Sequence, residues 1–584
     1  MKKSFLFIAA FLVCISVNAQ DAEWLTYYEK SNYLETPRYN ETIEYAKRLA
    51  KASEFIDYSV FGKSLQNRDL PLLIIDKNKN FTPQSVKESG NAVLLIEACI
   101  HPGESEGKDA GFMLIRDIVI HNKYPGLLDH TTILFIPIFN TDGHERFSAY
   151  NRINQNGPKE MGWRTTANNL NLNRDFSKAD AIEMQHWLKL FNAWLPDMFI
   201  DIHTTDGADY QYQLTYGMHI MGDMNMEQTA WQNKYLSEVE EKLSEDNVLM
   251  FPYVSFRRWH DPRSGLIRGT ASPRYSTGYS ANQNRPALLI ETHMLKDYKT
   301  RVEATYHTLK RSMEILQNDY AALKKINEQA DQETAQLSGK ELVLEYQTSQ
   351  EDSTTVKFKG VEYDIIPSDL TDGIWVKFTD KPKDYELVLF DKLIPTEKTI
   401  LPDAYIIAVE WQELIHRLDV HGIKYRVLDE TKDFDIETYK FSNVQFANYP
   451  FEGRQMVNSF SKEEIKTHKT FQKGSVIVPT NQRTAKIIAH LLEPDGPDSF
   501  LKWGFLNSIF ERKEYVETYV MEKMAREMIA ENPELKEEYK KAVAENPQYY
   551  NNQWTKLFWF FERTPFWDQQ KDIYPIGKLT NSDL

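Results

Sequence analysis

A histidine and a glutamate lie three residues apart where an apolar segment of the chain ends. Residues 92–100 are typical of a buried strand, and Pro102 and Gly103 stop that strand and turn the chain. The turn leaves His101 and Glu104 at the carboxyl end of the strand, where open α/β sheets place their sites. Both side chains could bind one zinc ion, at distances of about 2.0–2.2 Å. Solvated surface pairs share this spacing, so a metal site needs a third ligand and a base.

Two later strand ends supply those candidates. His203 ends an apolar strand at 197–203 and would lie beside His101 if the two strands are close in the sheet. Two histidines and one carboxylate form a catalytic zinc set that leaves a fourth position open for water. Glu291, at the end of the strand 286–291, is the best-placed further carboxylate and would act as general base on that water.

The segments that carry these residues alternate between apolar strands and helical periodicity. This alternation predicts an α/β fold, with a mostly parallel mixed sheet and helices on both faces. We expect strands at 55–60, 70–75, 92–100, 132–138, 197–203 and 286–291, and helices at 39–52, 109–119 and 301–327.

The second half of the chain has a different pattern. The polar segment 328–340 is a candidate boundary, after which short strands and turn residues predict a β-rich α+β region. We therefore predict a catalytic domain at 20–335, a β-rich α+β domain at 336–480 and a helical region at 481–584. The helices expected in that last region cover 484–492, 500–510, 514–531 and 533–544.

Composition and the amino terminus restrict partners and location. The chain has 584 residues and a formal charge of 69 − 85 = −16, with no basic groove for nucleic acid. Residues 1–19 have the basic start, apolar run and small-residue end of a signal peptide cleaved near Ala19. After residue 19 the sequence has no run of 18 apolar residues, so we predict no integral membrane segment there. We expect an exported protein, either periplasmic or secreted.

Several motifs together resemble the zinc carboxypeptidase family, the carboxypeptidase A/B-like metallopeptidases. They occur in the family's order at similar spacing, across about residues 40–320: His101-Pro102-Gly103-Glu104, Asn140-Thr141-Asp142-Gly143, Leu172-Asn173-Arg174-Asp175-Phe176, Asp201-Ile202-His203 and Leu289-Ile290-Glu291-Thr292. The resemblance implies one Zn²⁺ per chain, bound by His101, Glu104 and His203, and a zinc-bound water that Glu291 activates.

The same resemblance implies roles for residues that bind the substrate. Asn173 and Arg174 would hold a free α-carboxylate, because the planar fork of arginine binds carboxylates bidentately. A further arginine would stabilise the tetrahedral oxyanion, and Arg164, after a tryptophan, is preferred over Arg152. The family also has a mobile tyrosine, for which Tyr275 and Tyr279 are the candidates. Neither matches at a fixed spacing, so both stay open.

The resemblance, together with the predicted signal peptide, therefore implies an exported zinc-dependent peptidase that hydrolyses peptide bonds near a free C-terminal carboxylate. One alternative is a peptidase for cell-wall peptides, acting on γ-D-glutamyl or diaminopimelate-type bonds. Another is a zinc amidohydrolase or deacylase on the same scaffold, which the intact Asn173-Arg174 pair disfavours. A non-enzymatic binding module is disfavoured because the three ligands and the base are all present.

Overall fold

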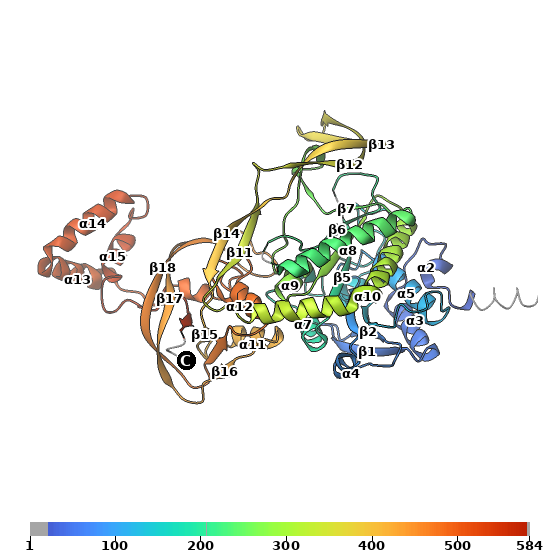
Figure 1. Ribbon diagram of the computed structural model, residues 1–584. Coiled ribbons are helices and arrows are strands. Elements are labelled where there is room, and N and C mark those ends of the chain that lie inside the picture. The colour runs from blue at the N-terminus through green and yellow to red at the C-terminus, as the bar shows by residue number, and fades with distance from the viewer. Residues whose placement is uncertain (1–21, 206, 223, 581–584) are drawn as a thin grey trace, which may run out of the picture.

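An eight-stranded mixed sheet forms the centre of the first half of the molecule (Figure 1). The computed structural model describes residues 22–205, 207–222 and 224–580, so the signal peptide predicted at 1–19 lies outside the described residues. In spatial order the strands are β1 (Ile56–Lys63), β2 (Asp69–Ile75), β4 (Thr131–Ile136), β3 (Ala92–Glu97), β5 (Met198–Thr205), β10 (Ala287–His293), β6 (Leu214–Gly217) and β7 (Met250–Pro252). The four strands β4, β3, β5 and β10 are parallel neighbours.

Helices pack on both faces of this sheet because its strands are apolar on both sides. All six residues of β3 are buried, and successive residues belong to different hydrophobic clusters: Val93 to one and Leu94 to the other. One cluster includes residues of α2 (Tyr27–Lys30), α3 (Tyr39–Ala52), α5 (Glu106–Val119), α8 (Met226–Glu245) and α10 (Tyr298–Thr334). The other includes residues of α4 (Pro83–Ser89), α7 (Ile182–Trp194) and α9 (Ser276–Asn282). The predicted α/β fold is confirmed.

Two antiparallel strand pairs follow α10, and one of them pairs with a strand from the first half of the chain. The strand β11 (Glu341–Thr348) pairs with β14 (Leu393–Ile400), and β12 (Thr354–Pro367) pairs with β13 (Ile374–Phe390). The strands expected at 373–378 and 386–390 are therefore parts of one 17-residue strand. The end of β13 pairs with β9 (Asp261–Ile267), which pairs with β8 (Ser255–Arg258), so one sheet combines both halves of the sequence.

A second large sheet lies at the carboxyl end of the chain. Its strands in order are β16 (Arg426–Val427), β19 (Val476–Pro479), β15 (Ala404–Ile407), β20 (Ile576–Leu579), β17 (Lys432–Phe446) and β18 (Val457–Phe471). Residues of α11 (Gln412–Val420) and α12 (Ala485–Leu492) belong to the same hydrophobic cluster as α7 and one face of the catalytic sheet. The two sheets thus share one core.

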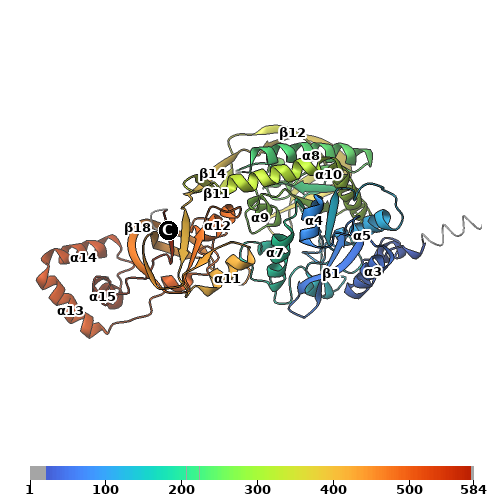
Figure 2. The same ribbon diagram turned by 60° about the horizontal axis from the view of Figure 1, so that its bottom comes forward.

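Three helices at the far carboxyl end stand apart from that core. They are α13 (Thr518–Glu531), α14 (Pro533–Glu545) and α15 (Gln553–Phe561), and they enclose a hydrophobic cluster of their own. Both ribbon views place them at one end of the molecule (Figures 1 and 2).

One expected helix, at 500–510, is wrong. The segment consists of turns and ends in the short 3₁₀ helix η2 (Asn507–Phe510). Gly504 has φ +80°, a left-handed conformation that interrupts a right-handed helix. Its apolar residues, among them Phe500, Leu501 and Trp503, are buried in the shared core. Among the described residues, no helix has the length and apolarity needed to cross a bilayer.

Candidate metal centre and substrate cavity

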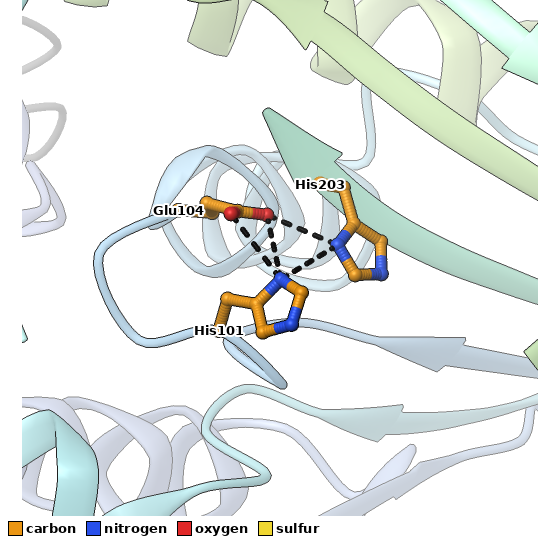
Figure 3. Close-up of side chains that lie close together, drawn as sticks. All are labelled: His101, Glu104 and His203. Atoms are coloured by element: carbon orange, nitrogen blue, oxygen red, sulfur yellow. Dashed lines mark hydrogen bonds and ion pairs between the residues drawn. The ribbon is translucent and has the colours of Figure 1, made fainter. Parts of the chain in front are cut away.

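Three buried side chains converge at the carboxyl ends of β3 and β5 (Figure 3). His101 and Glu104 belong to the turn after β3, and His203 is on β5. The Nδ1 atoms of the two imidazoles are 3.2 Å apart, and Glu104 Oε2 is 3.3 Å from His101 Nδ1 and 3.0 Å from His203 Nδ1. The three ligand atoms thus lie within reach of one common centre.

The donor set suits a zinc ion. Ligand atoms about 2.1 Å from a tetrahedral centre lie about 3.4 Å from one another, close to the separations of these three atoms. Two imidazole nitrogens and one carboxylate oxygen are ligand types that zinc takes in catalytic sites. The arrangement could therefore hold one ion and leave a fourth position open.

Hydrogen bonds fix which imidazole nitrogen carries the proton. His203 Nε2 lies 2.8 Å from Asp201 Oδ2, and an ionised carboxylate can only accept. His101 Nε2 lies 3.0 Å from Asn171 Oδ1, which also accepts the backbone N–H of Asn173 at 3.0 Å. Because that atom is an acceptor in both bonds, His101 Nε2 must donate. In each ring Nδ1 is then the nitrogen that faces the shared centre and would bind a metal.

A glycine in the His-Pro-Gly-Glu turn makes room for an arginine. A Cβ built on Gly103 would lie 2.6 Å from Arg152 Cγ, so any other residue would require the Arg152 side chain to shift. Arg152 passes over this position and its Nη2 binds Glu104 Oε1 at 2.7 Å, while Arg164 Nη1 is 3.5 Å from the same oxygen. The turn thereby brings two cations to one ligand.

These charges set the protonation of the ligands. Burial alone would raise the pKa of Glu104, but Arg152 and His101 hold that pKa well below its usual range, so the carboxylate is ionised. Burial lowers the pKa of His101 to about 4, with a smaller contribution from Arg164. Both residues are thus in the forms that bind a metal at neutral pH.

The metal centre opens into a cavity of about 480 Å³. Nine of the ten candidate site residues line it: His101, Glu104, Arg152, Arg164, Asn173, Arg174, His203, Tyr275 and Glu291. Glu291 is on β10 directly opposite His203 in the parallel register, so both side chains leave the sheet on the same side. The general-base candidate therefore lies next to the metal-ligand candidates.

Arg174 and Tyr275 form one wall of this cavity. The Arg174 guanidinium carbon lies 4.6 Å from the centre of the Tyr275 ring, a cation–π contact that orients the planar fork. The Oδ1 atom of the neighbouring Asn173 is buried and has no hydrogen-bond partner among the described residues. A substrate group that donates a hydrogen bond would satisfy it.

The structure does not bring Tyr279 to the cavity. The side chain is fully buried on the face of α9 that packs into the shared core, and its hydroxyl is 3.0 Å from His421 Nδ1. Tyr275, at the start of α9, is the tyrosine of the pair that lines the cavity.

Sequence reasoning missed the contribution of the carboxyl-terminal half to the cavity wall formed by Arg174 and Tyr275. The backbone N–H of Asn171 donates to Glu452 Oε2 at 2.8 Å. Arg274, next to Tyr275, makes two bonds to Asp498: Nε to Oδ1 at 2.5 Å, and its backbone N–H to Oδ2 at 2.8 Å. No local pattern in the sequence signals contacts between residues 224 or more positions apart.

Sequence reasoning also missed Asn171 and Arg268. Asn171 lies directly before the quoted motif at 172–176, and only its contact with His101 shows its role. Arg268 lines the cavity from the end of β9, in a segment without a recognised motif.

Comparisons with known proteins point in one direction. Residues 42–216 match the model of a family described as zinc carboxypeptidase. Carboxypeptidase 2 of Trichophyton rubrum is 23% identical over 487 residues, which cover 80% of this chain and 84% of that protein. Carboxypeptidase 2 of Trichophyton tonsurans is 22% identical over 489 residues, with coverage of 80% and 84%.

Solved structures with similar chains include two carboxypeptidases. Carboxypeptidase A from Helicoverpa armigera aligns with 50% of this chain and 74% of its own, at 15% identity and a TM-score of 0.38. A metallo-carboxypeptidase from Burkholderia cenocepacia aligns with 47% of this chain and 69% of its own, at 16% identity and a TM-score of 0.35.

Proposed function

Since this chain belongs to the zinc carboxypeptidase family and is a metallocarboxypeptidase, we propose that it is exported and hydrolyses the peptide bond next to a free C-terminal carboxylate. The observation that carries the proposal is the convergence in one cavity of the ligand cluster, Glu291 and the Asn173-Arg174 pair. The cavity thus combines a place for a metal, a base and a cation for the substrate's terminus.

The residues that would hold zinc are His101, Glu104 and His203. When bound there, zinc supplies a Lewis acid that polarises the scissile carbonyl and lowers the pKa of water. The protein's own contribution is to orient the two imidazoles through Asp201 and Asn171, and to keep Glu104 ionised through the cations beside it.

Glu291 would move the protons of the reaction. Its carboxylate would take a proton from the attacking water and deliver it to the leaving amine. Arg164 would hydrogen bond the oxygen that becomes negative, because its side chain is 40% exposed whereas that of Arg152 is 16% exposed and closer to Glu104.

Arg174 would select the end of the chain. Its guanidinium, held over the Tyr275 ring, would bind the α-carboxylate of the last residue through two N–H donors. This contact excludes internal segments of a polypeptide, which have no carboxylate there, and favours removal of the final residue.

A Glu291→Gln variant tests the role of the base. The substitution keeps the shape of the side chain and removes its basicity, so we expect kcat to fall by about 10²–10⁴-fold. Steady-state kinetics on a peptide with a free carboxyl end would measure this, with zinc content of both proteins as the control. Wild-type turnover in the variant would show that Glu291 is not the base.

Removal of the metal tests the cofactor. We expect dialysis against a chelator to abolish hydrolysis, and one equivalent of Zn²⁺ to restore it. Metal analysis of the purified protein should find about one zinc per chain. Full activity in metal-free protein would exclude zinc as the cofactor.

Two substrate classes remain to be separated by experiment. A cell-wall peptide with a free carboxyl end offers the same carboxylate to Arg174, so product analysis on a mixed peptide and muropeptide library decides between them. Export is supported by the basic and apolar residues at 2–17, and the amino-terminal sequence of the mature protein tests cleavage near Ala19.

A further inference from the structure

Arg268 is a charged side chain of the cavity wall that the proposed mechanism does not use. It follows β9 directly and lines the cavity together with Tyr216 of β6. The other charged side chains of the lining are metal-ligand candidates, bind Glu104, or have a role in the proposed reaction. Arg268 is therefore available for the substrate.

Arg268 lines the same cavity as Glu291 and the metal-ligand candidates. On β10, Glu291 is opposite His203 of β5 on one side and opposite Thr215 of β6 on the other. Neighbouring strands are about 4.8 Å apart, so β6 lies about 10 Å from the metal-ligand strand β5. Tyr216 and Gly217 of β6 line the cavity together with Arg268. The side chain of a residue bound beside Glu291 would extend towards Arg268.

The guanidinium of Arg268 has a donor to spare. One nitrogen, Nη2, donates to Asp391 Oδ2 at 2.7 Å. The Nε atom is buried and has no hydrogen-bond partner among the described residues. The nearby cavity wall includes Ile267, Tyr216 and Leu289, so a charge there is less screened than on the open surface.

This donor discriminates between substrates. A carboxylate placed against the exposed part of Arg268 would accept an N–H of the guanidinium and pair with its charge. A neutral side chain of the same size would displace water and leave the donor unpaired.

We propose that Arg268 binds a second carboxylate of the substrate, so that the enzyme prefers a C-terminal residue with an acidic side chain. The inference rests on the proposed peptidase function and names the substrate class of that site. Arg174 would hold the α-carboxylate and Arg268 the side-chain carboxylate. A glutamate or aspartate at the end of a protein fragment and a diaminopimelate residue of a wall peptide share this chemistry.

Matched peptides that differ only in their last residue test the preference. We expect wild-type enzyme to hydrolyse a peptide ending in Glu with a kcat/KM about ten- to a hundredfold above that for the same peptide ending in Gln. A third peptide ending in diaminopimelate distinguishes the two sources of the carboxylate. Equal kcat/KM for Glu and Gln in the wild type would overturn the proposal.

Variants connect the preference to this residue. Arg268→Gln should bring the Glu-to-Gln ratio close to one, and Arg268→Lys should give an intermediate ratio. The matched control is Arg311→Gln, because Arg311 also pairs with an aspartate, Asp246 at 2.7 Å, but lies outside the cavity lining. It should keep the wild-type ratio.

The outcomes separate this proposal from the proposed function. Hydrolysis of all peptides without an acidic preference, or an unchanged ratio in Arg268→Gln, overturns the role of Arg268 alone. Failure to hydrolyse any peptide with a free carboxyl end overturns both. If Arg268→Gln does not fold, the Glu-to-Gln ratios of kcat/KM in the wild type and in Arg268→Lys test the role of Arg268 instead.

Discussion

The two imidazoles of the metal centre differ in what they hydrogen bond behind the site. His203 donates to the carboxylate of Asp201, whereas His101 donates to the neutral amide of Asn171. A carboxylate behind an imidazole increases its basicity and strengthens its bond to a metal, more than an amide does. The affinity for zinc should therefore depend more on Asp201 than on Asn171.

Asp201→Asn measures that difference. We expect zinc affinity to fall about 10–100-fold, because the charge behind His203 is lost while the hydrogen bond can be kept. Competition with a chromophoric chelator gives the affinity. Asn171→Ala is the comparison variant, with a smaller expected loss. A larger loss in Asn171→Ala would contradict this ranking.

A buried acid on α5 makes stability depend on pH. Burial raises the pKa of Asp109 to about 6, and the side chain accepts a hydrogen bond from the Tyr298 hydroxyl at 2.5 Å. Below about pH 4 the group is protonated in both the folded and the unfolded state. Between pH 4 and 6 the unfolded chain loses the proton first, so stability falls as pH rises. Above pH 6 the carboxylate is ionised in both states, so the loss of stability caused by its burial stays constant.

Asp109→Asn removes that ionisation and keeps an acceptor for Tyr298. A shift of about two pKa units corresponds to roughly 3 kcal/mol of unfolding free energy. We expect the melting temperature of the variant, relative to wild type, to rise from pH 4 to pH 7. Thermal melts at the two pH values measure this. A constant difference would show that Asp109 is not protonated in the fold.

At the residue scale, the sequence revealed the groups whose role depends on strand ends. His101, His203 and Glu291 could be found because each follows an apolar strand and the parallel order brings such ends together. The choice between Tyr275 and Tyr279 could not be made, because it depends on how a seven-residue helix is rotated against the core.

At the scale of elements, the carboxylate-binding wall is held from outside the catalytic sheet. The start of α9 is fixed by Asp498, which binds both the side chain and the backbone N–H of Arg274. The Arg274 carbonyl in turn lies 3.4 Å from the backbone N–H of Phe176, close after η1 (Leu172–Arg174). Asp498 is thus a positioning residue for Tyr275 and Arg174.

Asp498→Ala tests that contact. We expect KM for a peptide with a free carboxyl end to rise about tenfold, with a smaller change in kcat, because the wall binds the substrate's terminus. Asp495→Ala is a matched control, since Asp495 pairs with Lys462 within the carboxyl-terminal half. A fall in kcat at unchanged KM would contradict a binding role.

Strands and helices were predicted well where periodicity was long, as in α3 and β3. The helix expected at 500–510 does not form, because apolar residues at that spacing can be buried by turns as well as by a helix. Contacts such as Arg268 with Asp391 are set by tertiary packing across both halves of the chain, which local pattern does not encode.

At the scale of the whole molecule, the helices α13–α15 form an insertion with adjacent ends. The backbone N–H of Asp572 donates to the carbonyl of Ile509 at 2.9 Å, so the chain leaves and re-enters the second sheet at one place. The strand β20 then follows in the middle of that sheet. The three helices can therefore be removed without removing the strand.

Two deletions distinguish the roles of these parts. Replacing residues 512–570 by a short Gly-Ser linker should leave folding and peptide hydrolysis close to wild type. Ending the chain after residue 335 should give insoluble protein, because one face of the catalytic sheet and α7 lose the apolar partners supplied by α11 and α12. Solubility, circular dichroism and kcat/KM measure both. A soluble, active 1–335 fragment would show that the shared core is dispensable.

The shared core also governs when the protein can fold during its synthesis. Strands β3 and β5 leave the ribosome long before α12, whose side chains help to cover the face that includes Val93 and Phe199. Until residues 485–492 have been made, α7 covers that face without its later partners, and the nascent chain presents an apolar surface to its surroundings. Translation must therefore pass residue 492 before the catalytic sheet is closed, and a chaperone that shields such surfaces would act throughout that interval.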